Sequence, residues 1–205
     1  MRRNALLALS ATVLATAAAA VLWSAAGGSG ALAQDPGFKQ GDRLTAPARA
    51  GKAGAAYREI SWEDLTPKDW DPMSAFKGLD LATLRDGDPR AMEALAKVQE
   101  IWAAAPVNEA MNNRRVRIAG FVVPLERRGM LVHEFLLVPY FGACIHTPPP
   151  PANQILHVFP AKPVNAVAMD PVWVEGALET RRSSTSMGNA GYRLNADAVT
   201  PYTRR

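Results

Sequence analysis

Residues 115–123 read Arg115-Val116-Arg117-Ile118-Ala119-Gly120-Phe121-Val122-Val123. In the first half of this stretch valine and isoleucine alternate with arginine, and a period of two is typical of a half-buried β-strand. Before Asn112 the apolar residues recur at helical spacing instead. The change of period predicts that the chain passes from helix to sheet near Asn112. Gly120, inside the predicted strand, predicts a bulge or a sharp bend.

The sequence after Asn112 contains several more short strand patterns, each separated from the next by turn residues. They are 131–138, 154–159, 172–178 and a short piece at 191–194. Gly176 has the same place in its strand as Gly120 has in the first. Several short strands with internal glycines favour a small, highly curved, mostly antiparallel barrel. We therefore expect an α+β chain that is mainly β, with an OB-like barrel over residues 112–205.

Residues 57–111 predict a helical segment that packs on this barrel. Asp88 is a suitable N-cap, and Pro89 fits the first helical position. An apolar stripe at helical period follows: Met92, Leu95, Ala96, Val98, Gln99, Ile101 and Trp102. Pro106 ends the pattern. Upstream of it, Trp62, Leu65, Trp70, Met73 and Phe76 are predicted to anchor a less regular segment to the core.

The N-terminus has the pattern of a secretory signal peptide. Arg2 and Arg3 precede an apolar run, and Ala31-Leu32-Ala33 forms a cleavage site, so we expect residues 1–33 to be removed after Ala33. The alternative is an uncleaved membrane anchor, because the run approaches the ~20 apolar residues of a span. No cysteine follows the run closely, which argues against a lipid anchor.

Residues 34–56 are rich in Gly, Ala, Pro, Lys and Arg and predict a flexible tether. Removal of the leader leaves 21 basic and 19 acidic residues, a net charge of +2. This charge is too small to indicate nucleic-acid binding. The predicted mature protein is therefore an exported, periplasmic chain without a nucleic-acid partner.

Cys144 is the single cysteine of the chain, and His146 follows it at i+2. One cysteine cannot form an intramolecular disulfide, and a spare thiol is open to oxidation in an exported protein. In an extended segment positions i and i+2 point the same way, so the sulfur and the imidazole can converge. Cys144 is therefore expected to be buried, bound to a metal, or kept as a reactive thiol.

The connection around Cys144 is unusually constrained for a loop. Pro148, Pro149, Pro150 and Pro151 predict a stiff polyproline rod, which has no amide hydrogens to donate. Asn153 and Gln154 then bring two side-chain amides to the start of the next strand. We expect these amides to satisfy loop carbonyls and so to close the loop, rather than to bind a substrate.

The stretch from Phe135 to His146, followed by Pro148-Pro149-Pro150 and Asn153-Gln154, resembles the signature of an uncharacterised family of exported bacterial proteins. The resemblance extends to Trp62-Glu63-Asp64-Leu65 and to the strand at 117–125. It implies a periplasmic protein, and family members are similar to proteins encoded beside ABC-type transport systems for zinc or other transition metals. It carries over only Cys144, His146, Asn153 and Gln154, and it implies no reaction.

Thiolate and imidazole are suitable ligands for zinc and copper. His133 and His157 would complete a set of four with Cys144 and His146, but geometry argues against it. If the strands pair with Val138 opposite Asn153, these two histidines face each other about five residues from the loop, or ~16 Å at ~3.3 Å per residue. We therefore expect Cys144 and His146 as the metal ligands and the other two histidines as ordinary strand residues.

Three hypotheses follow. We favour a non-enzymatic periplasmic accessory or metal-binding protein, with zinc or copper at Cys144 and His146 and an ABC-type transporter or another periplasmic protein as partner. The second is a thiol-dependent enzyme or redox factor in which His146 activates Cys144. The third is an OB-type binding module for a peptide, a glycan or a transporter partner, with a structural Cys144 loop.

Overall fold

The computed structural model describes residues 37–44, 56–71, 73, 77, 88–144 and 149–203. The predicted leader and His146 lie outside these residues. The elements of the first part are β1 (Arg58–Glu59), η1 (Glu63–Leu65), α1 (Pro89–Ala103) and η3 (Glu109–Met111). Those of the second part are β2 (Arg114–Arg128), β3 (Leu131–Val138), η4 (Ala152–Gln154), β4 (Leu156–Pro160), β5 (Val164–Asn165), β6 (Pro171–Glu179), β7 (Ser183–Thr185), β8 (Gly188–Ala190) and β9 (Tyr192–Pro201).

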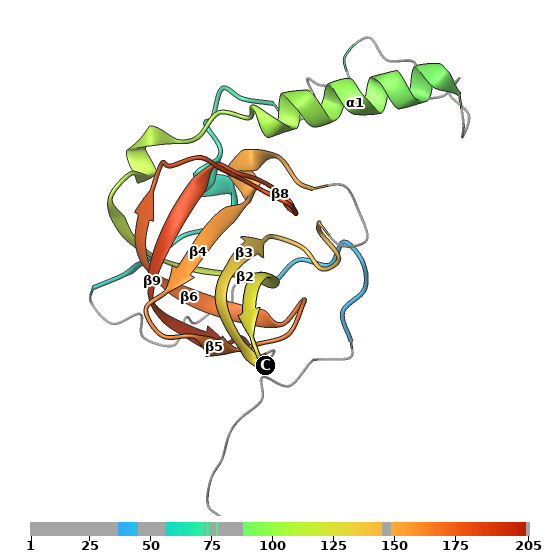
Figure 1. The fold of residues 1–205 in the computed structure, drawn as a ribbon. Helices are drawn as coiled ribbons and strands as arrows, with labels where there is room; N and C mark the ends of the chain where they lie inside the picture. The colour runs from blue at the N-terminus through green and yellow to red at the C-terminus, as the bar shows by residue number, and fades with distance from the viewer. Residues whose placement is uncertain are drawn as a thin grey trace, which may run out of the picture.

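Five strands close into a small barrel, as predicted (Figure 1). The ring runs β2-β6-β9-β4-β3 and returns to β2. All neighbours in the ring are antiparallel except β4 and β9, which are parallel. This closure, with the third and fifth barrel strands in parallel, is that of an OB-type barrel. The parallel pair is possible because β6 and the β7–β8 hairpin lie between β4 and β9 in the chain.

The two strand glycines have different roles. The pairing of β2 with β6 runs through Gly120 without a shift, so the predicted bulge is absent there. A Cβ at Gly120 would lie 2.9 Å from Cζ2 of Trp62, and the missing side chain makes room for this indole. Gly176 does stand at a register shift, between β6 and β9, and a Cβ there would lie 2.2 Å from the Asn195 carbonyl oxygen.

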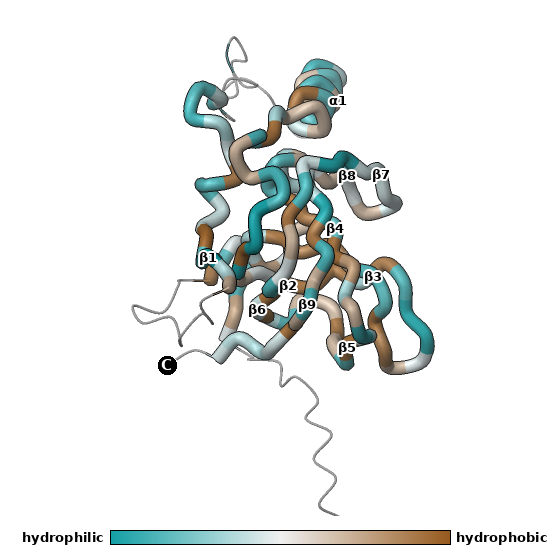
Figure 2. Tube along the Cα trace, turned by 90° about the vertical axis from the view of Figure 1, so that its left-hand side faces the viewer, coloured by the Kyte–Doolittle hydropathy of each residue, from teal (hydrophilic) through white to brown (hydrophobic). Residues whose placement is uncertain are grey.

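Residues from all five barrel strands, mostly at alternate positions, form a continuous core, and the apolar residues follow the strands (Figure 2). Trp62 and Leu65 join this core as predicted, with exposed fractions of 8% and 0%. The Trp62 indole donates a hydrogen bond to the Ala119 carbonyl, at 2.8 Å. Tyr192 in turn donates to the Leu65 carbonyl and accepts from the Asn108 amide, each at 2.6 Å. These bonds fix the non-helical segments before β2 to the barrel.

The helix differs from its prediction. Asp88 caps it by accepting from the Arg90 amide, and Pro89 opens it, as expected. Its buried residues, however, are Ala94 and Val98, whereas Met92 and Leu95 are 64% and 43% exposed. α1 lies across one end of the barrel, and its first turns project beyond it (Figure 1). Of the predicted stripe, Val98 is therefore buried while Met92 and Leu95 are exposed. The helical period indicates an apolar face but not which part of it is covered.

Residues 37–44, which we call the strap, also differ from the prediction. They belong to the predicted flexible tether, yet they lie against the loop after β3. Gly41 donates to the Phe141 carbonyl and Phe141 donates to the Asp42 carbonyl, both at 2.9 Å. Phe38 and Leu44 then pack on the barrel exterior. The composition of the whole tether is polar, but these two side chains supply enough apolar area to dock a short piece of it.

A second apolar cluster lies on the outer side of β2 and β3, and we call it the outer cluster. Its buried members are Phe121, Val123, Leu136, Val138, Ala143, Ile155, Met169 and Ala190, with Phe38, Leu44, Cys144 and Met187 among the side chains packed against it. The strap, the Cys144 loop and the β7–β8 hairpin cover part of this outer side.

No helix in the described ranges is both long enough and apolar enough to span a membrane.

Candidate functional site

The Cys144 loop is held from several sides. Arg43 of the strap forms an isolated antiparallel bridge with Tyr140, and the Gly142 amide lies 3.0 Å from the Met169 sulfur. Cys144 has a φ of +64°, in the left-handed region that non-glycine residues seldom adopt. The loop is thus shaped by contacts with distant segments and not by its own sequence alone.

Cys144 itself is half-buried at the edge of the outer cluster. Burial raises the pKa of its thiol to about 11, because a thiolate would lose hydration there. A thiol with this pKa is protonated at neutral pH, which disfavours the reactive-thiol hypothesis. His146 lies outside the described residues, so the predicted convergence of the sulfur with the imidazole stays a prediction.

Asn153 and Gln154 are structural ties, but not within their own loop. Asn153 is fully buried and donates to the Pro106 carbonyl at 2.9 Å. The Gln154 amide donates to the Trp62 carbonyl at 2.8 Å and to the Thr66 hydroxyl at 2.9 Å. We predicted that they would close the loop; instead they join it to the segments around η1 and after α1. Sequence separations of 47 and 92 residues concealed these partners.

Pro151, at the end of the polyproline segment, and Gln154 line a cavity of about 520 Å³. We call it the signature cavity and define it by Arg43, Trp70, Trp102, Tyr140, Pro151 and Gln154. Its walls come from the strap, the segment after η1, the end of α1 and the loops flanking η4. Its volume is within the range of ~300–1,000 Å³ that is usual for small-molecule sites. Pro148 lies outside the described residues.

A smaller cavity, of about 190 Å³, adjoins the same structure. Pro149 and Pro150 line it together with Gly188 of the hairpin. Trp102 lines both cavities, so the two hollows flank one indole. Three of the predicted loop-organising residues, Pro149, Pro150 and Gln154, therefore line cavities, which the sequence did not indicate.

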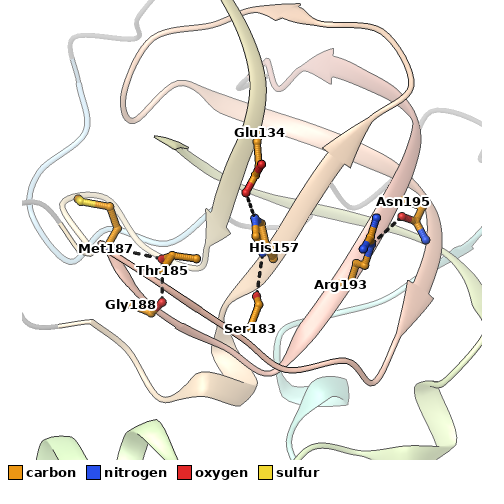
Figure 3. A network of polar contacts seen from close by, with 8 residues as sticks. All are labelled: Glu134, His157, Ser183, Thr185, Met187, Gly188, Arg193 and Asn195. Atoms are coloured by element: carbon orange, nitrogen blue, oxygen red, sulfur yellow. Dashed lines mark hydrogen bonds and ion pairs between the residues drawn. The ribbon is translucent and has the colours of Figure 1, made fainter. Parts of the chain in front are cut away.

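A different cluster of polar groups ties the β7–β8 hairpin to the barrel (Figure 3). His157 Nε2 lies 2.5 Å from a Glu134 carboxylate oxygen, and His157 Nδ1 lies 2.7 Å from the Ser183 hydroxyl. With the proton on Nε2, the imidazole donates to Glu134 and accepts from Ser183. This carboxylate–imidazole–hydroxyl order is the one that activates serine nucleophiles.

The surroundings of this cluster favour a structural role. His157 is 7% exposed and its ring lies 4.4 Å from that of Phe159. Neither cavity described above is lined by Glu134, His157 or Ser183. A hydrolase needs room for a substrate and donors for an oxyanion beside the nucleophile. The cluster is therefore best described as a clamp that holds the hairpin onto the barrel, and we call it the hairpin clamp.

The observed register also corrects the predicted placement of the strand histidines. His157 is opposite Leu136, not opposite His133, and Leu137 is opposite Leu156. The shift arises because η4 occupies 152–154, so β4 begins two residues later than the predicted strand. Cross-strand distance alone would not have found Glu134, which reaches the ring of His157 diagonally.

Among the described residues, no group of three or more His, Cys, Asp and Glu side chains is arranged to hold a metal ion. Met169 and Met187 belong to the same outer cluster as Cys144. Thiol and thioether ligands suit soft ions such as Cu(I) better than zinc. Nothing in the sequence pattern around Cys144 pointed to these two methionines, which are 25 and 43 residues away.

The family model of DUF3299, described as proteins of unknown function, matches residues 62–201. This range contains the segments with Trp62, Cys144 and Gln154. The chain belongs to this family. The predicted resemblance to an uncharacterised family is thereby confirmed at the level of the family.

The crystal structure of a DUF3299 family protein, PA4066 from Pseudomonas aeruginosa PAO1, is similar to this chain. The two are 39% identical over 73% of this chain and 99% of the other, with a TM-score of 0.59. No curated protein matches the sequence of this family member.

Proposed function

We propose that this DUF3299 protein is a non-enzymatic, exported ligand-binding protein, and that the signature cavity is its binding site. The observation that carries the proposal is that Trp70, Trp102 and Tyr140 line one cavity together with Pro151 and Gln154. Three aromatic side chains offer a large apolar contact area at little entropic cost. Gln154 is fixed by two hydrogen bonds, so this part of the lining is already in place before a ligand arrives.

The biological setting follows the expectations from the sequence. The leader at 1–33 favours the periplasm, and the family resemblance favours an ABC-type transport system for a transition metal as the partner system. In that setting the protein would deliver a small ligand to the transporter or retain the ligand in the periplasm.

The test uses the mature chain, residues 34–205, and a set of small neutral aromatic probes that includes indole. Ligand-observed NMR and quenching of tryptophan fluorescence measure binding. We expect saturable binding that Trp102→Ala and Trp70→Ala each weaken at least 5-fold. Met130→Ala is the matched control, because Met130 is 65% exposed at a turn outside the cavity. Absence of saturable binding, or binding unchanged by both tryptophan variants, would overturn the proposal.

A second candidate function is binding of a soft metal ion at the Cys144 loop. It is supported by Cys144, Met169 and Met187 lying in one outer cluster, with His146 two residues from the thiol. The donor set fits Cu(I) better than zinc. A bound cation would offset the cost of forming the thiolate in a buried position.

Competition with chromophoric chelators tests this candidate for Cu(I) and for zinc. We expect Cys144→Ser and His146→Ala to abolish binding, and Met169→Leu to weaken binding of Cu(I) and not of zinc. His133→Ala is the control and should have no effect. Equal affinity in Cys144→Ser and in the unchanged protein would exclude the site.

A further inference from the structure

The charged residues of the signature cavity define the chemistry that it can accept. Arg43 and Lys68 bring two cations to its lining, and Glu63 brings one carboxylate. All three side chains belong to exposed residues, and none of them forms an ion pair with another residue in the described ranges. Arg43 contacts the Tyr140 ring instead, with its guanidinium carbon 5.7 Å from the ring centroid. The lining of the cavity therefore has a net positive charge, and Glu63 can still pair with a positive group of a ligand.

The uncharged polar groups of the cavity also restrict which ligand groups it can bind. The Gln154 side-chain nitrogen donates to the Trp62 carbonyl, to the Thr66 hydroxyl and, at 3.4 Å, to the Asn153 carbonyl, which fixes the direction of the amide. The Gln154 carbonyl oxygen accepts no hydrogen bond from the described residues, so it remains available as an acceptor. The Thr66 hydroxyl accepts from Gln154 and still has its own proton to donate. The lining thus offers one acceptor and one donor in addition to its charged groups.

The apolar part of the cavity is large compared with these polar groups. Trp70 and Trp102 are both half-buried, and they are 32 positions apart in the sequence. Pro151 adds a rigid apolar part of the lining. A ligand that filled about 520 Å³ would need an aromatic or similarly apolar portion beside its charged end.

We propose that the ligand is an aminocarboxylate with more carboxylates than amines and with one aromatic or bulky apolar group. Its carboxylates pair with Arg43 and Lys68, and its ammonium group pairs with Glu63 and the Gln154 carbonyl oxygen. The apolar group packs on the tryptophans. This inference rests on the proposed binding function, and it adds the class of ligand.

The dipeptide Glu-Trp serves as the probe, because it has two carboxylates, one amine and an indole. The comparison compounds are Gln-Trp-amide, which lacks both carboxylates, and N-acetyl-Glu-Trp, which lacks the amine. Isothermal titration at low and at raised salt gives the affinities. We expect Glu-Trp to bind at least 10-fold more tightly than Gln-Trp-amide, with a preference that falls as salt increases.

Charge-removing variants assign each group. Arg43→Gln and Lys68→Gln should each weaken Glu-Trp about 3- to 5-fold, the effect of a partly exposed ion pair, and leave Gln-Trp-amide unchanged. Glu63→Gln should remove the preference of Glu-Trp over its N-acetyl form. Lys162→Gln is the matched control, since Lys162 is exposed and lines no part of this cavity.

The outcomes separate the two proposals. If neutral aromatic probes bind at the tryptophans but Glu-Trp and Gln-Trp-amide bind equally, the cavity is a binding site and the charge assignment is wrong. If the neutral probes bind and neither peptide does, the aminocarboxylate class is also wrong. If no probe binds, both proposals fail. Circular dichroism and melting temperature confirm that each variant is folded.

Discussion

The core of the barrel and the outer cluster are both apolar, yet they are assembled differently. The core takes alternate residues from long strands, such as Phe135 and Leu137 of β3. The outer cluster uses the opposite face of the same strand, Leu136 and Val138, and covers it with side chains from the strap, the Cys144 loop and the hairpin. The first arrangement needs only a period of two. The second needs several distant segments to arrive at one place, and the signature cavity is built in this second way.

The sharpest test of this difference compares two tryptophans. Trp62→Ala should lower the free energy of unfolding by about 3–5 kcal/mol, since it empties a core position and removes the bond to Ala119. Trp102→Ala should cost only about 1 kcal/mol, because its ring is half-exposed beside two cavities. Denaturant melts measure both values. Equal losses would mean that the end of α1 is part of the core after all.

The hydrogen bonds that tie Asn153 and Gln154 to the segments before β2 should have intermediate effects on stability. Asn153→Asp replaces the donor to the Pro106 carbonyl with a buried acceptor, and we expect a loss of about 1–3 kcal/mol at neutral pH. The loss should shrink when the pH is lowered enough to protonate the introduced carboxyl group. Gln154→Glu, at a position that is only half-buried, is the control and should cost less. If Asn153→Asp leaves the free energy of unfolding unchanged at neutral pH, the hydrogen bond to the Pro106 carbonyl does not stabilise the fold.

The hairpin clamp is expected to contribute about 1 kcal/mol. Ser183→Ala and His157→Gln should each lower stability by about this amount, and amide exchange should increase first in β7 and β8, because each removes one hydrogen bond to the hairpin. Double-mutant analysis gives the coupling between the two residues. An alkyl fluorophosphonate should not label Ser183, and rapid labelling lost in His157→Gln would instead identify an activated nucleophile.

The last prediction concerns the reactivity of the Cys144 thiol, which should depend clearly on pH. Because burial raises the thiol pKa to about 11, alkylation by iodoacetamide in the native state should be slow at pH 7.5 and accelerate toward pH 11. The unfolded protein, with an ordinary thiol pKa near 8.5, should react fast at lower pH. Mass spectrometry of timed samples measures both rates. Fast native alkylation at neutral pH would restore the reactive-thiol hypothesis.

Much of the fold was predictable from the sequence because it depends on local periodicity. The strand at Leu131–Val138 was predicted with its observed bounds, and the cap of α1 by Asp88 and Pro89 was also correct. The barrel followed from the number of short strands and from the strand glycines. The register of β4 was wrong by two residues because η4 has no periodic signal of its own.

The candidate site was only partly predictable. Asn153 and Gln154 could be recognised as organising residues, but their partners could not, since Pro106 and Trp62 lie far away in the chain. Trp102 was predicted as a core residue from its place in an apolar stripe, and it lines cavities instead. An aromatic residue that lines a cavity and one that is buried in a core can have the same helical spacing, so the spacing does not distinguish them.

The sequence by itself determined which residues alternate, where the helix begins, and which loop carries the thiol and the prolines. These properties depend on neighbours within a few residues, so they can be read along the chain. Tertiary structure alone decided that the strap lies on the loop and that Met169 and Met187 join Cys144 in one cluster. It also decided that His157 meets Glu134 and Ser183, and that two tryptophans and Gln154 line one cavity. The closure of the barrel brings these residues together, and the identity of neighbours across a closed barrel is not encoded in any short segment.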